Sequence, residues 1–208
     1  MKRLAVLGAG GHGKVVADTA QCCGWELVEF FDDSWPSRTR NGDWSVVGNS
    51  TTLLERLQEY DGVIVAIGNN TVRHGKLSEL LASSAPVVSL VHPAAVVSRY
   101  ASIGAGSVVF AGVVVNADAS VGIGAILNSG CSVDHDCRLA DAIHVGPGAR
   151  VAGGVSIGED TWIGIGASIR QMVTVGAQVV VGAGAAVVND VSDNVVVVGV
   201  PAKVVPGS

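Results

Sequence analysis

An aliphatic residue recurs at every sixth position between residues 97 and 187. Steps of six from Val97 meet Val, Ile or Leu at all sixteen positions, and glycine often follows the aliphatic residue. This period is typical of a parallel β-helix, in which each six-residue unit forms one face and three faces close a coil of about eighteen residues. The repeat therefore predicts about five coils, stacked at a strand spacing of roughly 4.8 Å and uninterrupted by a long loop.

The first 92 residues follow a different pattern, in which apolar runs alternate with helix-like segments. We expect strands at 2–8, 25–31, 62–68 and 87–91, and helices at 12–23, 50–58 and 71–82. Strands that alternate with helices predict a parallel sheet built from βαβ units. The chain should thus contain an α/β domain with a small Rossmann-like sheet (1–92) and an all-β helix domain (93–208).

Two local features of the predicted α/β domain are less regular. Ser50, Thr51 or Thr52 is available as the N-cap of the second helix. Segment 33–49 contains proline and glycine breakers, so we expect it to be a loop.

The composition restricts the classes of partner. The net charge is −5 and only 15% of the residues are charged, so general attraction to nucleic acid or an anionic membrane is not expected. Glycine and polar residues interrupt every apolar stretch before it reaches bilayer length, and the short apolar run after Arg3 does not suit a signal peptide. Cys131 and Cys137 share one small-residue position of the repeat, which predicts packing roles in a reduced, cytoplasmic protein.

Gly8, Gly10 and Gly13 form a G-x-G-x-x-G pattern between a predicted strand and a predicted helix. The backbone N–H groups of such a loop can approach a phosphate, and the helix N-terminus favours the negative charge. Asp32, about twenty residues further on, completes a dinucleotide fingerprint, so NAD is one candidate ligand. The small number of predicted strands and the β-helix that follows argue against a dehydrogenase.

His135 lies between Asp134 and Asp136 in a repeat that otherwise carries few charges. Its position past the inward Val133 predicts a corner residue that faces outward. A neutral imidazole can accept a proton from an attacking group, and a neighbouring carboxylate raises its basicity. His144 follows nine residues later, which is half a coil, so the two histidines of one chain should face different sides. They can share a site only where a second subunit supplies its His144.

Eight short segments, in their order and spacing, resemble a group of hexapeptide-repeat acyltransferases: the sialic-acid O-acetyltransferase-like and UDP-4-amino-sugar N-acetyltransferase family. The segments are GAGGHG (8–13), FFDD (30–33), AIGNN (66–70), HPAAVVS (92–98), LNSGCSVDHDC (127–137), HVGPGARVAGGV (144–155), WIGIGAS (162–168) and VGVPAK (198–203). The resemblance implies a left-handed β-helix, a homotrimer with active sites between subunits, acetyl-CoA as co-substrate and no metal ion.

The resemblance also implies roles for individual residues. It places the substrate contacts in the α/β domain at Gly10, Gly11, His12, Asp32, Asp33 and Gly68. It makes His135 the general base, with Asp136 as its partner where the family commonly has Glu, and it puts Asn128 in the same site; Asp134 is the alternative partner. It assigns the acetyl-CoA contacts to His144 and to backbone groups at Gly153, Ile165 and Ala183. Backbone contacts of this kind place no demand on the side chain.

These features predict an N-acetyltransferase that moves the acetyl group of acetyl-CoA to a nucleotide-activated amino sugar, foremost a UDP-4-amino-4,6-dideoxy sugar, in bacterial surface glycan biosynthesis. Direct transfer is expected, because no cysteine or serine is placed to carry the acyl group. The open alternatives are a sialic-acid O-acetyltransferase, a GDP-4-amino-sugar (perosamine) N-acetyltransferase and a non-enzymatic NAD-binding scaffold. A carbonic-anhydrase-like β-helix would need three metal-binding histidines, and the repeat supplies His135 and His144 alone.

Overall fold

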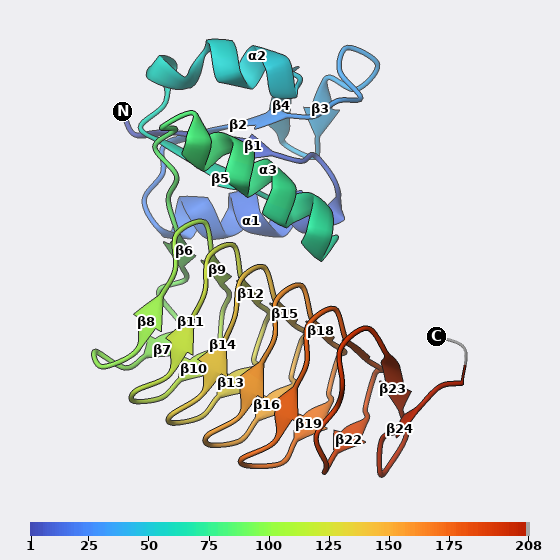
Figure 1. The fold of residues 1–208 in the computed structure, drawn as a ribbon. Helices are drawn as coiled ribbons and strands as arrows, with labels where there is room; N and C mark the ends of the chain where they lie inside the picture. The colour runs from blue at the N-terminus through green and yellow to red at the C-terminus, as the bar shows by residue number, and fades with distance from the viewer. Residues whose placement is uncertain (207–208) are drawn as a thin grey trace. The chain divides into compact units, whose positions relative to one another are not determined.

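The computed structural model describes residues 1–206, and these divide into two compact units (Figure 1). The first unit is Met1–Pro93 and the second begins at Ala94. Each unit has its own buried apolar residues.

The first unit is built on a five-stranded sheet with the order β3-β4-β2-β1-β5. Its strands are β1 (Arg3–Leu7), β2 (Leu27–Phe31), β3 (Arg40–Asn41), β4 (Trp44–Gly48) and β5 (Gly62–Val65). Four of them run parallel, and β3 pairs antiparallel with β4. The sheet is therefore of the parallel, Rossmann-like kind that the alternating pattern predicts.

Three helices cover this sheet, and β1 and β5 are buried along most of their length. The helices are α1 (Gly11–Cys22), α2 (Ser50–Glu55) and α3 (Asn70–Ala82), with a 3-10 turn at Leu57–Glu59. In Figure 1, α2 lies above the sheet, whereas α1 and α3 lie below it. Val16 and Ala20 of α1, and Leu77 and Leu80 of α3, are buried at the spacing of one helical face.

The expectation of a loop at 33–49 is wrong, because this segment contains β3 and β4. Gly42, with φ of 65°, forms the turn between these strands rather than breaking them. Val46 is 3% exposed and pairs with Phe30 of β2, so β4 belongs to the sheet, with a register shift between Phe30 and Phe31. Together with β1, β2 and β5 they make up the five strands of the sheet, and the pattern of apolar runs does not reveal them.

Two further expectations for this unit need correction. The N-cap of α2 is Asn49, whose side chain accepts a hydrogen bond from the Thr52 backbone N–H at 2.9 Å. The strand expected at 87–91 is limited to β6 (Leu90–Val91), and Val87 forms a single parallel bridge with Val63.

The second unit is a parallel β-helix whose two-residue strands begin every six residues from β7 to β22. Each strand ends on the predicted aliphatic residue, so the repeat runs without interruption as expected. The strands are β7 (Val96–Val97), β8 (Ser102–Ile103), β9 (Val108–Val109), β10 (Val114–Val115), β11 (Ser120–Val121), β12 (Ile126–Leu127), β13 (Ser132–Val133), β14 (Arg138–Leu139), β15 (His144–Val145), β16 (Arg150–Val151), β17 (Ser156–Ile157), β18 (Trp162–Ile163), β19 (Ser168–Ile169), β20 (Thr174–Val175), β21 (Val180–Val181), β22 (Ala186–Val187), β23 (Val196–Val198) and β24 (Lys203–Val204).

Strands one coil apart pair with each other and form the three faces. One face has the order β22-β19-β16-β13-β10-β7, the second β20-β17-β14-β11-β8, and the third runs from β24 and β23 through β21, β18, β15 and β12 to β9. Val115 pairs with Val97 on one side and with Val133 on the other. A residue therefore lies beside the residue eighteen positions further along the chain.

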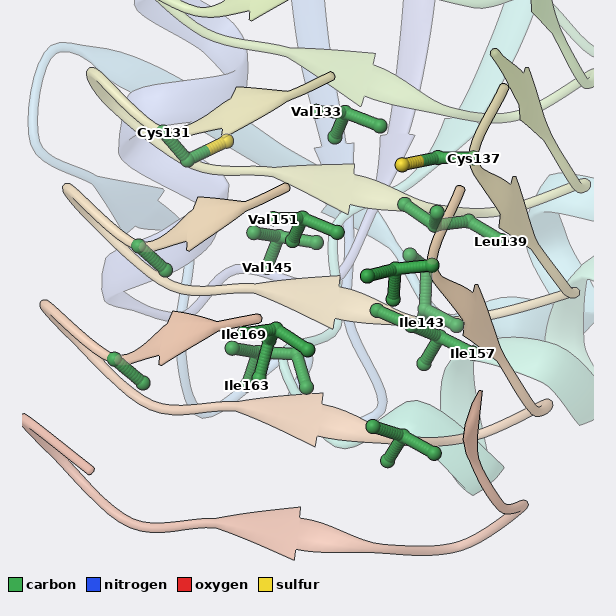
Figure 2. Packing of buried hydrophobic residues seen from close by; sticks show 14 of the residues in the cluster. Cys131, Val133, Cys137, Leu139, Ile143, Val145, Val151, Ile157, Ile163 and Ile169 are labelled. Atoms are coloured by element: carbon green, nitrogen blue, oxygen red, sulfur yellow. The ribbon is translucent and has the colours of Figure 1, made fainter. Parts of the chain in front are cut away.

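The inward side chains stack into ladders that form the core of the β-helix (Figure 2). Val133 and Val145 are fully buried, as are Cys131 and Cys137. Figure 2 shows both cysteines among the aliphatic side chains of neighbouring coils, so their predicted packing role is confirmed. No helix within residues 1–206 has the length and apolar character needed to cross a bilayer.

Candidate active site

His135 and Asp136 form a side-chain pair on the turn that follows β13. His135 Nδ1 lies 2.7 Å from Asp136 Oδ2, and the two side chains are 63% and 65% exposed. An ionised carboxylate can only accept, so Nδ1 carries the hydrogen and the neutral ring keeps its lone pair on Nε2. The hydrogen bond that His135 donates to Asp136, and then the charge of Asp134, raise the pKa of His135.

Asp134 has a different task from Asp136. Its Oδ1 accepts hydrogen bonds of 2.9 Å from Asn116 Nδ2 and from the backbone N–H of His135. These bonds, with the His135 backbone contact as the largest cause, lower the pKa of Asp134. Asp134 thus fixes the turn, and the imidazole of His135 is held by Asp136.

Gly153 lies one coil beyond His135 and faces its ring. A Cβ atom at Gly153 would come within 2.6 Å of His135 Cε1 and Nε2, whereas real Cβ contacts are longer than 3.0 Å. The next residue, Gly154, donates its backbone N–H to the His135 carbonyl at 2.9 Å. The imidazole therefore occupies the space of a missing side chain. A side chain at position 153 would have to displace this ring, which the expectation that any side chain would serve there leaves out.

His144 and Asn128 lie together on a different face of the same chain. His144, in β15, is 5% exposed, and its Nε2 lies 3.1 Å from Asn128 Nδ2. Asn128 Oδ1 accepts from the backbone N–H of Ser129 at 2.8 Å, which turns the amide donor toward the histidine. His144 Nε2 is therefore a hydrogen-bond acceptor. Within one chain, Asn128 thus lies with His144 and not with His135.

A groove of about 310 Å³ runs beside His144. Its lining is Asn128, His144, Gly146, Pro147, Trp162, Gly164, Ile165, Val180, Val181, Gly182 and Ala183. Three of the four expected coenzyme contacts, His144, Ile165 and Ala183, are thus brought together, and Gly153 lies elsewhere with His135. The Trp162 ring packs against His144 with 4.0 Å between ring centres. Sequence reasoning missed Trp162, although its place one coil after His144 is a usable signal.

Some glycines of the first unit are required by the backbone of the strand–helix turn, and others border open space. Gly8 has φ of 112°, and a Cβ at Gly13 would lie 2.4 Å from the Gly8 carbonyl oxygen, so both are needed for the close strand–helix turn. Gly10, Gly11 and Gly68 border open space, where a Cβ would meet no atom within 4 Å. Gly10 is the N-cap of α1 and supplies no side-chain cap, so the helix N-terminus is available to an anion.

Asp32 and Asp33 hold the loops around this helix N-terminus. Asp32 accepts hydrogen bonds from the Ala9 backbone N–H at 2.7 Å and from Ser34, and Asp33 accepts from the backbone N–H of Ser50 at 2.9 Å. Burial opposes ionisation of Asp32, but the bonds from Ser34 and Ala9 outweigh it and lower its pKa. The hydroxyl and N–H of Ser50 lower the pKa of Asp33. Both carboxylates are thus engaged within the unit.

His12 is half-buried at the start of α1. Burial, and then the charge of Arg73, lower its pKa to about 4, so the ring is neutral near pH 7.

Three side chains that sequence reasoning missed contact the loop carbonyls next to the expected substrate residues: Arg38, Asn41 and Arg73. Arg38 and Asn41 lie in the segment expected to be a loop, so the pattern gave no reason to select them. Within residues 1–206 no cluster of His, Cys, Asp and Glu could hold a metal ion.

A parallel β-helix with a corner histidine and, on another face, an apolar groove, preceded by a small α/β unit, defines the class of hexapeptide-repeat acyltransferases. Residues 3–80 match the family model for the PglD N-terminal domain. The curated UDP-N-acetylbacillosamine N-acetyltransferase of Bacillus subtilis is 35% identical over 113 residues, which are 53% of this chain and 52% of that protein. The match thus spans about half the length of that curated relative.

Two solved structures are similar over nearly the whole chain. A histidine-to-asparagine mutant of perosamine N-acetyltransferase from Caulobacter crescentus, in complex with CoA and GDP-perosamine, is 40% identical (TM-score 0.93; 99% of this chain and 97% of that chain). The acetyltransferase domain of PglB from Neisseria gonorrhoeae, in complex with acetyl coenzyme A, is 42% identical (TM-score 0.93; 98% and 99%). The chain belongs to this family of sugar N-acetyltransferases, and its β-helix is left-handed, as predicted.

Proposed function

We propose that the protein transfers the acetyl group of acetyl-CoA to the amino group of a nucleotide-activated amino sugar. The observation that carries the proposal is the His135–Asp136 pair, which leaves a lone pair on an exposed imidazole nitrogen beside Gly153. The relatives support the same chemistry, because the Bacillus subtilis protein is a UDP-N-acetylbacillosamine N-acetyltransferase and the Caulobacter crescentus protein is a perosamine N-acetyltransferase. The proposed setting is bacterial surface glycan biosynthesis in the cytoplasm.

Acetyl-CoA supplies the acetyl group as a thioester. The amino nitrogen of the sugar forms the new bond to the acetyl carbon as the carbon–sulfur bond breaks. His135 Nε2 takes the proton that this nitrogen loses, and the proton ends on the sulfur of the departing thiol. Asp136 stabilises the imidazolium through the Nδ1 hydrogen bond, and such a base typically accelerates transfer by about 10²–10⁴-fold.

The groove beside His144 is proposed to hold acetyl-CoA. It is lined mostly by apolar side chains, among them Trp162 and Ile165, which suits the pantetheine arm. His144 and His135 lie on different faces of one chain. We therefore assign each active site to two subunits of a homotrimer, with the groove of one subunit placed against the His135 turn of the next. In this arrangement Asn128 acts on the coenzyme side, through His144.

The nucleotide-sugar is proposed to bind the first unit, at the N-terminus of α1 and the open space beside Gly10, Gly11 and Gly68. A UDP-4-amino-4,6-dideoxy sugar is the first candidate, in keeping with the UDP-N-acetylbacillosamine relative. GDP-perosamine is the second, because the relative that binds it matches 99% of this chain. The N-acetyltransferase relatives give no support to a sialic-acid O-acetyltransferase or a NAD-binding scaffold.

Release of free CoA thiol, measured with acetyl-CoA and a panel of UDP- and GDP-4-amino sugars, tests the activity. His135→Gln keeps a polar side chain but cannot take a proton, so kcat should fall by about 10²–10⁴-fold. His74→Gln, a histidine of α3 outside the β-helix, is the matched control and should retain wild-type kcat. Near-normal turnover by His135→Gln would refute His135 as the base.

The same variant tests the shared site. His135→Gln and His144→Ala subunits, unfolded together and reassembled, should recover activity, because some interfaces then combine an intact His135 with an intact His144. Each variant reassembled alone remains weak. If mixed trimers form but show no recovered activity, the active site is not shared between subunits, and this part of the proposal is wrong.

A further inference from the structure

Arg73 is a fully buried arginine in the first unit. It lies in the first turn of α3 and is 1% exposed, although arginine is rarely buried to this extent. Burial of a guanidinium is costly unless hydrogen bonds compensate it. The chain therefore keeps this side chain for its contacts.

Three hydrogen bonds of Arg73 go to the loop between β5 and α3 and to the first residue of α3. Arg73 Nη1 donates to the carbonyls of Ile67 and Gly68 at 3.0 and 3.1 Å, and Nη2 donates to Asn70 Oδ1 at 2.9 Å. One planar guanidinium thus fixes three acceptors of a short segment. Hydrogen bonds from a charged donor are roughly twice as strong as neutral ones, so the loop is held firmly.

The neighbouring loop after β1 is held in a similar way. Arg38 Nη1 donates to the Ala9 carbonyl at 2.6 Å, and Asn41 Nδ2 donates to the Gly10 carbonyl at 3.2 Å. β1 and β5 are adjacent in the sheet (Figure 1), so both loops lie at the same edge. At both loops the carbonyl oxygens, which would repel a phosphate, are engaged by side-chain donors.

We infer that Arg73 is a positioning residue for the diphosphate group of the nucleotide-sugar, an inference that rests on the proposed function. Its hydrogen bonds hold the loop at Gly68 in place, and its guanidinium supplies a fixed positive charge there. His12 contributes no charge at neutral pH because its pKa is low, so the positive end of α1 and the buried guanidinium provide the local attraction for an anion.

Titration calorimetry with UDP, GDP and CoA tests this role. Arg73→Met should weaken binding of the nucleoside diphosphate that the wild type prefers by at least about tenfold, because it removes charge-assisted hydrogen bonds. The Kd of CoA and kcat at saturating sugar should stay within about twofold of wild type, since neither involves this loop. Arg73→Lys keeps the charge but cannot hold all three acceptors, so it should recover part of the affinity.

Arg56→Met is the matched control. Arg56 is also held by hydrogen bonds, but its partner is Glu59 and not a loop carbonyl. Its loss should lower the melting temperature without changing nucleotide affinity.

If Arg73→Met or Arg73→Lys binds nucleotide like the wild type, even with a lower melting temperature, Arg73 is structural and the inference is overturned. If Arg73→Met does not fold, weaker binding by Arg73→Lys carries the test. Failure of the wild type to bind either nucleotide would overturn the proposed function as well.

Discussion

The two units of this chain reveal their functional residues in different ways. In the β-helix every inward position repeats with the same period, so a residue with another purpose is conspicuous. His135 is an outward side chain of unusual type in such a background, and Trp162, which sequence reasoning missed, is a second one. In the α/β unit, Arg38 and Arg73 hold the candidate substrate loops through contacts that follow no period.

This difference arises from the geometry of neighbours. In the β-helix the residue eighteen positions away is always the neighbour in the next coil, so contacts follow from counting. Gly153 beside His135 and Trp162 beside His144 both obey this rule. In the α/β unit the neighbours depend on how helices and loops pack, which a sequence pattern does not specify.

The largest effect on turnover is expected at Gly153, which lies eighteen residues after the candidate base His135 and therefore beside it. Gly153→Ala introduces a methyl group where the His135 ring lies, so the ring must move. A misplacement of about 1 Å can lower turnover by up to about a hundredfold, and we expect kcat to fall by ten- to a hundredfold. The KM for acetyl-CoA should change little, because a methyl group leaves the backbone groups of Gly153 in place.

Gly75→Ala is the control for this substitution. Gly75 lies in α3 and a Cβ there would meet no atom within 4 Å, so kcat should be unchanged. If Gly153→Ala raises the KM for acetyl-CoA while kcat is preserved, Gly153 serves the coenzyme alone. The contact with His135 would then have no consequence for catalysis.

The next effect concerns pH. Asp136 raises the pKa of His135, and the imidazole acts as a base only when deprotonated, so activity is lost as pH falls through this raised pKa. Asp136→Asn removes the carboxylate and lowers the pKa. The acid limb of the kcat/KM profile should therefore move to lower pH. The plateau should fall because the imidazolium loses its carboxylate partner, but only by about tenfold, because the imidazole itself remains.

The amino group of the sugar also titrates, but equally with both enzymes, so the difference between the two profiles reports the imidazole. Asp134→Asn is the useful comparison, since Asp134 bonds to the backbone of the turn rather than to the ring. It should shift the acid limb less than Asp136→Asn. If the acid limb of Asp136→Asn stays at the wild-type pH, Asp136 does not raise the pKa of the catalytic base, and this prediction is wrong.

The same contrast explains how much was predictable. The β-helix, its uninterrupted register and the outward His135 could be read from the six-residue period. The choice between Asp134 and Asp136 could not, because both flank the ring and side-chain rotamers decide which one bonds to it. In the α/β unit β3 and β4 were missed, since a two-residue strand and a strand of five residues next to Gly42 resemble a loop in sequence. Short strands carry too few residues to display a period.

The smallest effect tests local structure in the α/β unit. Asn49→Ala removes the side chain that accepts from the Thr52 N–H, and loss of an N-cap typically costs about 1 kcal/mol. The two units differ in fold, so a local measurement is preferable to global unfolding. Amide exchange at Thr52 should accelerate by about fivefold, the factor equivalent to 1 kcal/mol. Thr51→Ala, at an exposed position that the sequence also offered as a cap, should leave this rate unchanged. Equal exchange in both variants would mean that packing, and not Asn49, determines where α2 begins.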